Sequence, residues 1–279
     1  MRIYGFADEA SSDINEQILA MKRNGLDGLE IRNVDGVNIS DITVAKAQEV
    51  RKKLRDNGLT VWSMGSPIGK IDIVKDDFNE HLDKFRHTLE LAKVLETENI
   101  RLFSFYMPEG RNPEDYRNEV IDRMGQLLDV AKGTGVTLCH ENEKGIYGDD
   151  AKHCLELFHA LPQLKGVFDP ANFVQCGQDT LEAWKLLHPY IKYLHIKDAC
   201  ADGSIVPAGK GAGNISAIIS AYQAQGGDVL SMEPHLAVFQ GLSALEREGE
   251  KSNISAYAYK DNQTAFDAGC AALRTLLLL

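Results

Sequence analysis

Four short hydrophobic segments in the C-terminal half of the chain each end in a side chain that can bind a metal ion. Each interval between them is long enough for one helix and a return strand, so parallel strands would carry all four side chains to one rim of a sheet. Three carboxylates gathered there with an imidazole would repel one another strongly unless a divalent cation lay among them. The pattern therefore predicts a metalloenzyme. The segments are VTLCHE ending at Glu141, KGVFD ending at Asp169, KYLH ending at His195 and VLSME ending at Glu233.

Each of these side chains also has a structural interpretation. A carboxylate after a strand often caps the next helix, and Asp169 before Pro170 suits a turn. His195 alone would suit a hydrogen-bonded core histidine, and Glu141 a solvated loop charge. All four side chains occupy equivalent positions at the ends of successive strands. Four unrelated structural roles at these positions are less probable than one shared metal site. One nitrogen and three oxygen donors predict one hard divalent ion, Mn²⁺ first, with Mg²⁺, Co²⁺, Zn²⁺ and Fe²⁺ as alternatives.

The elements that must position these residues alternate along the whole chain. Eight β-type runs alternate with amphipathic helical runs, which predicts an α/β protein with one (β/α)₈ TIM-barrel domain over residues 1–279. A doubly wound open sheet is the alternative, but it would carry fewer strands, and no GxGxxG follows the first strand. The active sites of such barrels lie at the C-terminal ends of the strands, where all four candidates fall. The strands begin near Arg2, Leu26, Leu59, Ile100, Val136, Lys165, Lys192 and Asp228.

The composition excludes several classes of partner. The chain has 279 residues, 44% of them hydrophobic, and a net charge of -11, so a surface for nucleic acid is not expected. No apolar stretch is long enough for a signal peptide core or a membrane span. The five cysteines form no CxxC pair and are odd in number, which is typical of reduced thiols in a cytoplasmic protein.

The segments CHENE, FDPAN, HIKD and MEP, set on eight βα units, resemble the sugar phosphate isomerase/epimerase superfamily. This group of xylose isomerase-like barrels includes ketose 3-epimerases, inosose dehydratases and class II apurinic-site endonucleases. The resemblance covers essentially the whole chain and implies that the four strand-end side chains are the four metal ligands. Barrels of this group often pair through outer helices and the loop 237–262, so a homo-oligomer is compatible with the resemblance.

The chain departs from the endonuclease branch, which uses three zinc ions and additional histidines. Arg32 and Asn33 follow the second strand, and Asn172 stands where a histidine is expected after the sixth-strand aspartate. The Asp-x-His expected after the seventh strand is missing from GSIVPAG. These departures favour one metal ion over three, and they count against a metal phosphodiesterase.

The metal site and the resemblance together predict a reaction. A vicinal hydroxy-ketone can chelate the ion, which polarises its carbonyl and stabilises an enediolate. The resemblance to ketose epimerases implies that Glu141 and Glu233 bind the metal and exchange protons with opposite faces of one carbon. We expect an isomerase or epimerase acting on a small sugar or sugar phosphate. A keto-sugar or inosose dehydratase shares the same first step and stays open, as does a non-catalytic sugar-binding or metal-binding barrel.

Further polar residues are candidates for binding substrate. Lys197 is in phase with His195, and could meet a substrate oxygen or form a salt bridge to a neighbouring strand end. Asn172 could donate to a substrate hydroxyl or cap a helix, and His235 could support a ligand or contact substrate. Lys210 in GKGAG lies where barrels commonly bind phosphate. Glu30 is interpreted as a structural carboxylate at the barrel mouth.

Overall fold

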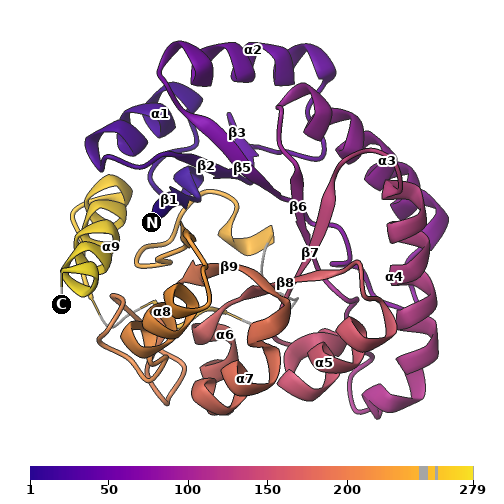
Figure 1. The fold of residues 1–279 in the computed structure, drawn as a ribbon. Coiled ribbons are helices and arrows are strands. Elements are labelled where there is room, and N and C mark those ends of the chain that lie inside the picture. Colours follow the sequence, from indigo (N-terminus) through magenta and orange to yellow (C-terminus); the bar gives the residue numbers. More distant parts are fainter. Residues whose placement is uncertain (245–250, 255–256, 279) are drawn as a thin grey trace.

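A closed barrel of eight parallel strands forms the centre of the molecule (Figure 1). The computed structural model describes residues 1–244, 251–254 and 257–278. Around the barrel the strands follow the order β1-β12-β9-β8-β7-β6-β5-β2, so the TIM-barrel prediction is confirmed and the open sheet was wrong. The barrel strands are β1 (Arg2–Gly5), β2 (Gly28–Ile31), β5 (Thr60–Gly65), β6 (Asn99–Leu102), β7 (Thr137–Glu141), β8 (Lys165–Phe168), β9 (Ile191–Ile196) and β12 (Val229–Met232).

Helices surround the barrel as an outer ring (Figure 1). Several begin at an aspartate whose side chain accepts hydrogen bonds from the first free amides of the helix, as Asp13, Asp77 and Asp179 do. In the described part of the chain, no helix has both the length and the apolar character needed to cross a membrane. The α-helices are α1 (Ile14–Arg23), α2 (Val44–Asp56), α3 (Phe78–Val94), α4 (Arg117–Ala131), α5 (Ala151–Ala160), α6 (Pro170–Gln175), α7 (Thr180–Leu187), α8 (Ile215–Ala224) and α9 (Asn262–Leu277).

Short elements decorate the connections between strands and helices. Two antiparallel hairpins follow β2 and β9, and both lie on the side of the barrel where the strands end. Residues 245–250 and 255–256 of the loop expected at a subunit contact fall outside the described part of the chain. The hairpin strands are β3 (Asn33–Val34), β4 (Val37–Asn38), β10 (Asp198–Ala199) and β11 (Ile205–Val206), and the 3-10 helices are η1 (Ala7–Glu9), η2 (Pro113–Tyr116), η3 (Tyr147–Asp149), η4 (His188–Tyr190) and η5 (Leu242–Ala244).

The barrel interior is layered beneath the strand ends. Cys139, Val167 and Tyr193 belong to one buried cluster inside the barrel. Each of them lies two residues before a candidate ligand, and alternate residues of a strand point to the same side. The interior apolar layer therefore supports a polar layer directly above it, at the C-terminal ends of β7, β8 and β9.

Candidate metal centre and active site

The four predicted ligands lie together at the C-terminal ends of their strands. All four are buried, and each offers one ligand atom within 4.8 Å of the ligand atoms of the others. The Nδ1 atom of His195 lies 2.9 Å from Glu141 Oε1 and 3.3 Å from Glu233 Oε2. The same nitrogen lies 3.9 Å from Asp169 Oδ2. Three carboxylates thus gather around the Nδ1 atom of a single imidazole.

Glu30 fixes the orientation of the imidazole from the opposite wall of the barrel. The Nε2 atom of His195 lies 3.0 Å from Glu30 Oε2, and Glu30 Oε1 accepts a hydrogen bond from the Tyr193 hydroxyl at 2.6 Å. If Nε2 carries the proton and donates it to Glu30, the Nδ1 lone pair faces the three acidic ligands. Glu30 is fully buried inside the barrel, where the sequence suggested a structural carboxylate at the barrel mouth. Burial lowers the pKa of His195, but the charges of Glu141 and Glu30 outweigh burial and raise that pKa well above its ordinary value.

Asp169 uses its two oxygens for different purposes. Its Oδ1 accepts a hydrogen bond from the Asn172 backbone amide and caps α6. Its Oδ2 forms a salt bridge with Lys197, whose Nζ lies 2.9 Å away, and faces the His195 Nδ1 at 3.9 Å. Burial raises the pKa of Asp169 to about 7, despite the opposing charge of Lys197. One oxygen caps the helix while the other faces the cluster, so capping and ligation are compatible here.

Two buried arginines pair with the two glutamates of the cluster. Arg101, on β6, places its Nε 3.1 Å from Glu141 Oε2. Arg32, directly after β2, places its Nη1 2.8 Å from Glu233 Oε1. Burial alone would raise the pKa of Glu233, but Lys197, His235 and His195 together outweigh burial and hold that pKa well below its ordinary value. Neither arginine was predicted from the sequence as part of the site, where Arg32 stood out only as a departure from a histidine.

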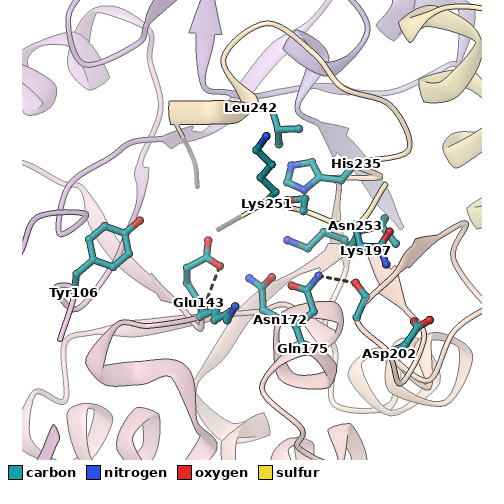
Figure 2. Close-up of a pocket in the computed structure, with 14 residues that line it drawn as sticks. Tyr106, Glu143, Asn172, Gln175, Lys197, Asp202, His235, Leu242, Lys251 and Asn253 are labelled. Carbon is teal, nitrogen blue, oxygen red and sulfur yellow. Dashed lines mark hydrogen bonds between the residues drawn. The ribbon is translucent and has the colours of Figure 1, made fainter. Parts of the chain in front are cut away.

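A polar cavity of about 280 Å³ opens beside the cluster (Figure 2). Three of the predicted substrate-binding residues, Asn172, Lys197 and His235, line it, together with Glu143. Asn172 donates to the Asn142 carbonyl at 2.8 Å, so its side-chain orientation is fixed. Lys197 forms the salt bridges that were one of its two predicted alternatives. Figure 2 shows Lys197 and His235 reaching into the cavity from a different side than Glu143 and Asn172.

The glycine loop after β9 does not bring Lys210 to the cavity. Lys210 is exposed and is absent from the described lining residues. The Asp198 carboxylate accepts hydrogen bonds at 2.9 Å from the backbone amides of Gly209, Gly211 and Gly213. A Cβ atom on Gly211 would lie 2.4 Å from Asp198 Oδ1, so the loop needs glycine there to close around this carboxylate. The sequence suggested that this loop binds a phosphate group. In the structure its backbone amides bind the Asp198 carboxylate instead.

The closed eight-stranded barrel, with a cluster of acidic and histidine side chains at its strand ends, places the protein among the TIM barrels. Sequence comparison identifies the family within this class. Residues 18–250 match the model of the xylose isomerase-like TIM barrel family, and the chain belongs to that family. A 3-dehydroshikimate dehydratase of Bacillus anthracis is 21% identical over 178 residues, which span 63% of this chain and 62% of that protein.

Solved structures share the fold over nearly the full chain. An L-ribulose 3-epimerase, 21% identical, has a TM-score of 0.74 and covers 100% of this chain and 94% of its own. The IolI protein with a bound zinc atom, 17% identical, has a TM-score of 0.75 and covers 99% of this chain and 98% of its own. The similar proteins therefore include both an epimerase and a dehydratase, on one shared barrel.

Proposed function

We propose that this protein is a divalent-metal-dependent enzyme that removes a proton from the carbon beside a carbonyl group of a small sugar, as an isomerase or epimerase does. The observation that carries this proposal is the meeting of four buried donors beside a cavity lined by polar side chains that can hydrogen-bond to hydroxyl groups. One metal ion is expected, with Mn²⁺ first among Mg²⁺, Co²⁺, Zn²⁺ and Fe²⁺, because three of the four donors are hard carboxylate oxygens.

The four ligands named above would hold the ion. When bound, it would polarise the substrate carbonyl and stabilise the negative charge that develops when the neighbouring carbon loses its proton. The buried position of Glu141 and Glu233 supports a role in moving that proton, since water is excluded around both carboxylates. The two glutamates come from β7 and β12, with β8 and β9 between them, so they approach a substrate from different directions.

The remaining cavity residues would bind and orient the substrate. Lys197 and His235 supply donors on one side, and Asn172 supplies a fixed side-chain amide on another. Proton return to the opposite face of the same carbon gives an epimer, whereas return to the adjacent carbon gives an isomer. The backbone amides of the Lys210 loop already bind Asp198, so this loop does not support a phosphate-binding role.

A dehydratase is the second candidate function. It is favoured by the relative from Bacillus anthracis, a 3-dehydroshikimate dehydratase, and it needs the same first proton removal. The two candidates differ in the second step of the reaction. A dehydratase expels a β-hydroxyl as water, whereas an epimerase or isomerase keeps every substrate atom.

The test is an exchange experiment in deuterated water. The Mn²⁺-loaded protein is incubated with ketoses, ketose phosphates, inososes and 3-dehydroshikimate, and products are followed by proton NMR. Deuterium at carbon in an epimer or isomer supports the first proposal, and an unsaturated product that has lost water supports the second. Ligand binding with no exchange on any substrate would contradict both and indicate a non-catalytic barrel.

We also infer a cytoplasmic setting and a small-molecule partner, with no nucleic-acid or membrane partner. All five cysteines are unpaired, which suits a reducing compartment. The net charge of -11 argues against a polyanionic partner. Homo-oligomer formation remains a proposal that sedimentation or light scattering of the purified protein would test.

A further inference from the structure

The two glutamates of the cluster divide their oxygens in the same way. Glu141 directs Oε1 toward the His195 Nδ1, at 2.9 Å, while Arg101 takes Oε2. Glu233 directs Oε2 toward the same nitrogen, at 3.3 Å, while Arg32 takes Oε1. In each carboxylate one oxygen faces the cluster, and the other is held by a guanidinium group.

Both arginines are themselves anchored. Arg32 is 1% exposed and donates from Nε and Nη2 to the two oxygens of Asp8, at 2.9 and 3.0 Å. Arg101 is 2% exposed and donates from Nη1 to the Ser66 carbonyl at 3.0 Å. Each guanidinium therefore bridges a fixed acceptor and one oxygen of a glutamate. A planar group with several donors can do this, whereas a lysine ammonium group cannot reach both partners in the same geometry.

Phe6 links the two arginines into one unit. Its ring centroid lies 4.2 Å from the Arg32 Cζ and 5.5 Å from the Arg101 Cζ, and its ring meets the His195 ring edge to face at 5.3 Å. Gly65 leaves the space that this arrangement needs. A Cβ atom there would lie 2.4 Å from Phe6 Cε1 and 3.1 Å from Arg101 Nη2.

We propose that Arg32 and Arg101 are positioning residues that fix Glu233 and Glu141 so that each presents one oxygen, and only one, to the metal ion. This inference rests on the proposed function. Charge compensation alone would require only a positive charge at each place, because a buried carboxylate is costly without a partner. Positioning requires in addition the forked geometry of arginine, and this difference makes the two roles separable.

The test measures the affinity for Mn²⁺ alone, by isothermal titration calorimetry, in Arg101→Lys and Arg32→Lys. Lysine keeps the charge and loses the fork, so we expect the Kd for Mn²⁺ to rise about ten-fold or more while the stoichiometry stays near one. Arg123→Lys is the matched control, because Arg123 also stacks on an aromatic ring, Phe78, but pairs with Glu119 far from the cluster. Its Kd should stay within about two-fold of the wild type.

The spectrum of the bound ion gives a second readout. The electron paramagnetic resonance signal of Mn²⁺ should change shape in both cluster variants and stay unchanged in the control. An unchanged Kd and spectrum in folded Arg101→Lys and Arg32→Lys would overturn the positioning role and leave charge compensation. If one of the two variants fails to fold, the other carries the test alone, and a wild-type Kd and spectrum in it would overturn the proposal.

The metal site and the positioning role fail in different ways. A wild-type protein that binds no Mn²⁺ overturns the proposed metal dependence, and the positioning role falls with it. A wild-type protein that binds Mn²⁺ no more tightly than its folded lysine variants overturns the positioning role alone.

Discussion

The two halves of the barrel contribute differently to the same centre. The C-terminal half, from β7 to β12, carries the four candidate ligands, whereas the N-terminal half carries groups that hold three of them in place. Glu30 holds His195, Arg101 holds Glu141, and Arg32 holds Glu233. The fourth ligand is held within its own half, by the start of α6 and by Lys197.

This difference shows how so many acids can be buried together. An unpaired buried carboxylate costs several kcal/mol, so a cluster of ligands would oppose folding if it had no counterions. The N-terminal half supplies these counterions from fixed positions, and the cluster forms as part of the packed barrel. Asp169 is the ligand with the weakest compensation, which is consistent with its pKa of about 7.

The largest effect is expected from a change in the ligand half. Glu233→Gln removes the carboxylate that would move the proton but keeps the shape of the side chain, so turnover should fall by about 10³-fold or more. The rate of deuterium exchange into substrate measures it, with circular dichroism to establish the fold. Glu119→Gln is the control, because Glu119 pairs with Arg123 far from the cluster and the cavity. Near-wild-type exchange in Glu233→Gln would remove the proton-transfer role.

A smaller effect is expected from a change in the N-terminal half, which holds the candidate ligands in place. Glu30→Gln removes the charge that orients His195, so the affinity for Mn²⁺ should fall by about 10-fold to 100-fold. Isothermal titration calorimetry on the variant and the wild type measures this change. An unchanged affinity would mean that the N-terminal half fills space around the ligands without orienting them.

The meeting of the four side chains in the C-terminal half could be predicted from the sequence because its signal repeats. Each ligand ends a β-type hydrophobic run at an equivalent place in a βα unit, and parallel strands must bring such places together. Glu141, Asp169 and His195 each follow the interior residue of their own strand by two positions, which also fixes the face on which they lie.

The residues of the N-terminal half that hold the candidate ligands show no repeating pattern in the sequence. Arg101 stands alone in the strand NIRL, and the residue that it contacts depends on barrel closure, which local sequence does not specify. Arg32 could have been found from a different signal, since an arginine at the end of a fully buried strand needs an acidic partner. Lys210 was placed at a phosphate site because a glycine loop offers the same amides to phosphate and to Asp198.

The contribution of His81, in the N-terminal half, to the free energy of unfolding should depend on pH. The Gly69 amide donates to His81 Nε2 at 2.7 Å, and burial lowers the pKa of His81 to about 4. The unfolded chain binds a proton at this histidine below about pH 6.5, whereas the native protein does so only near pH 4. The free energy of unfolding should therefore fall by about 3 kcal/mol from this group alone as the pH drops from 6.5 to 4.

His81→Gln should lack this contribution while keeping a side-chain acceptor for the amide. Urea unfolding at pH 7 and pH 4.5 gives the change in the free energy of unfolding for each protein. The difference between the wild type and the variant is the contribution of His81, because the other titratable groups are the same in both. An identical pH dependence in the two proteins would contradict a neutral, buried His81.

The smallest effect is expected at Lys210, on the rim of the ligand half. Lys210→Ala removes an exposed side chain outside the cavity, so KM and kcat should stay within about two-fold of the wild type. Steady-state kinetics with a phosphorylated and an unphosphorylated substrate measures both values. A large rise in KM for the phosphorylated substrate alone would restore the phosphate site that the sequence suggested.

The most direct test of the metal centre is elemental analysis of the wild type and Asp169→Asn after incubation with Mn²⁺ and removal of the excess. Asparagine is also a good helix cap, so the variant should keep α6 while losing the negative charge that faces the cluster. About one ion per wild-type chain, and far less in the variant, is the predicted result. No ion in the wild type, or equal content in both proteins, would contradict the metal centre, and about three zinc ions would favour a phosphodiesterase.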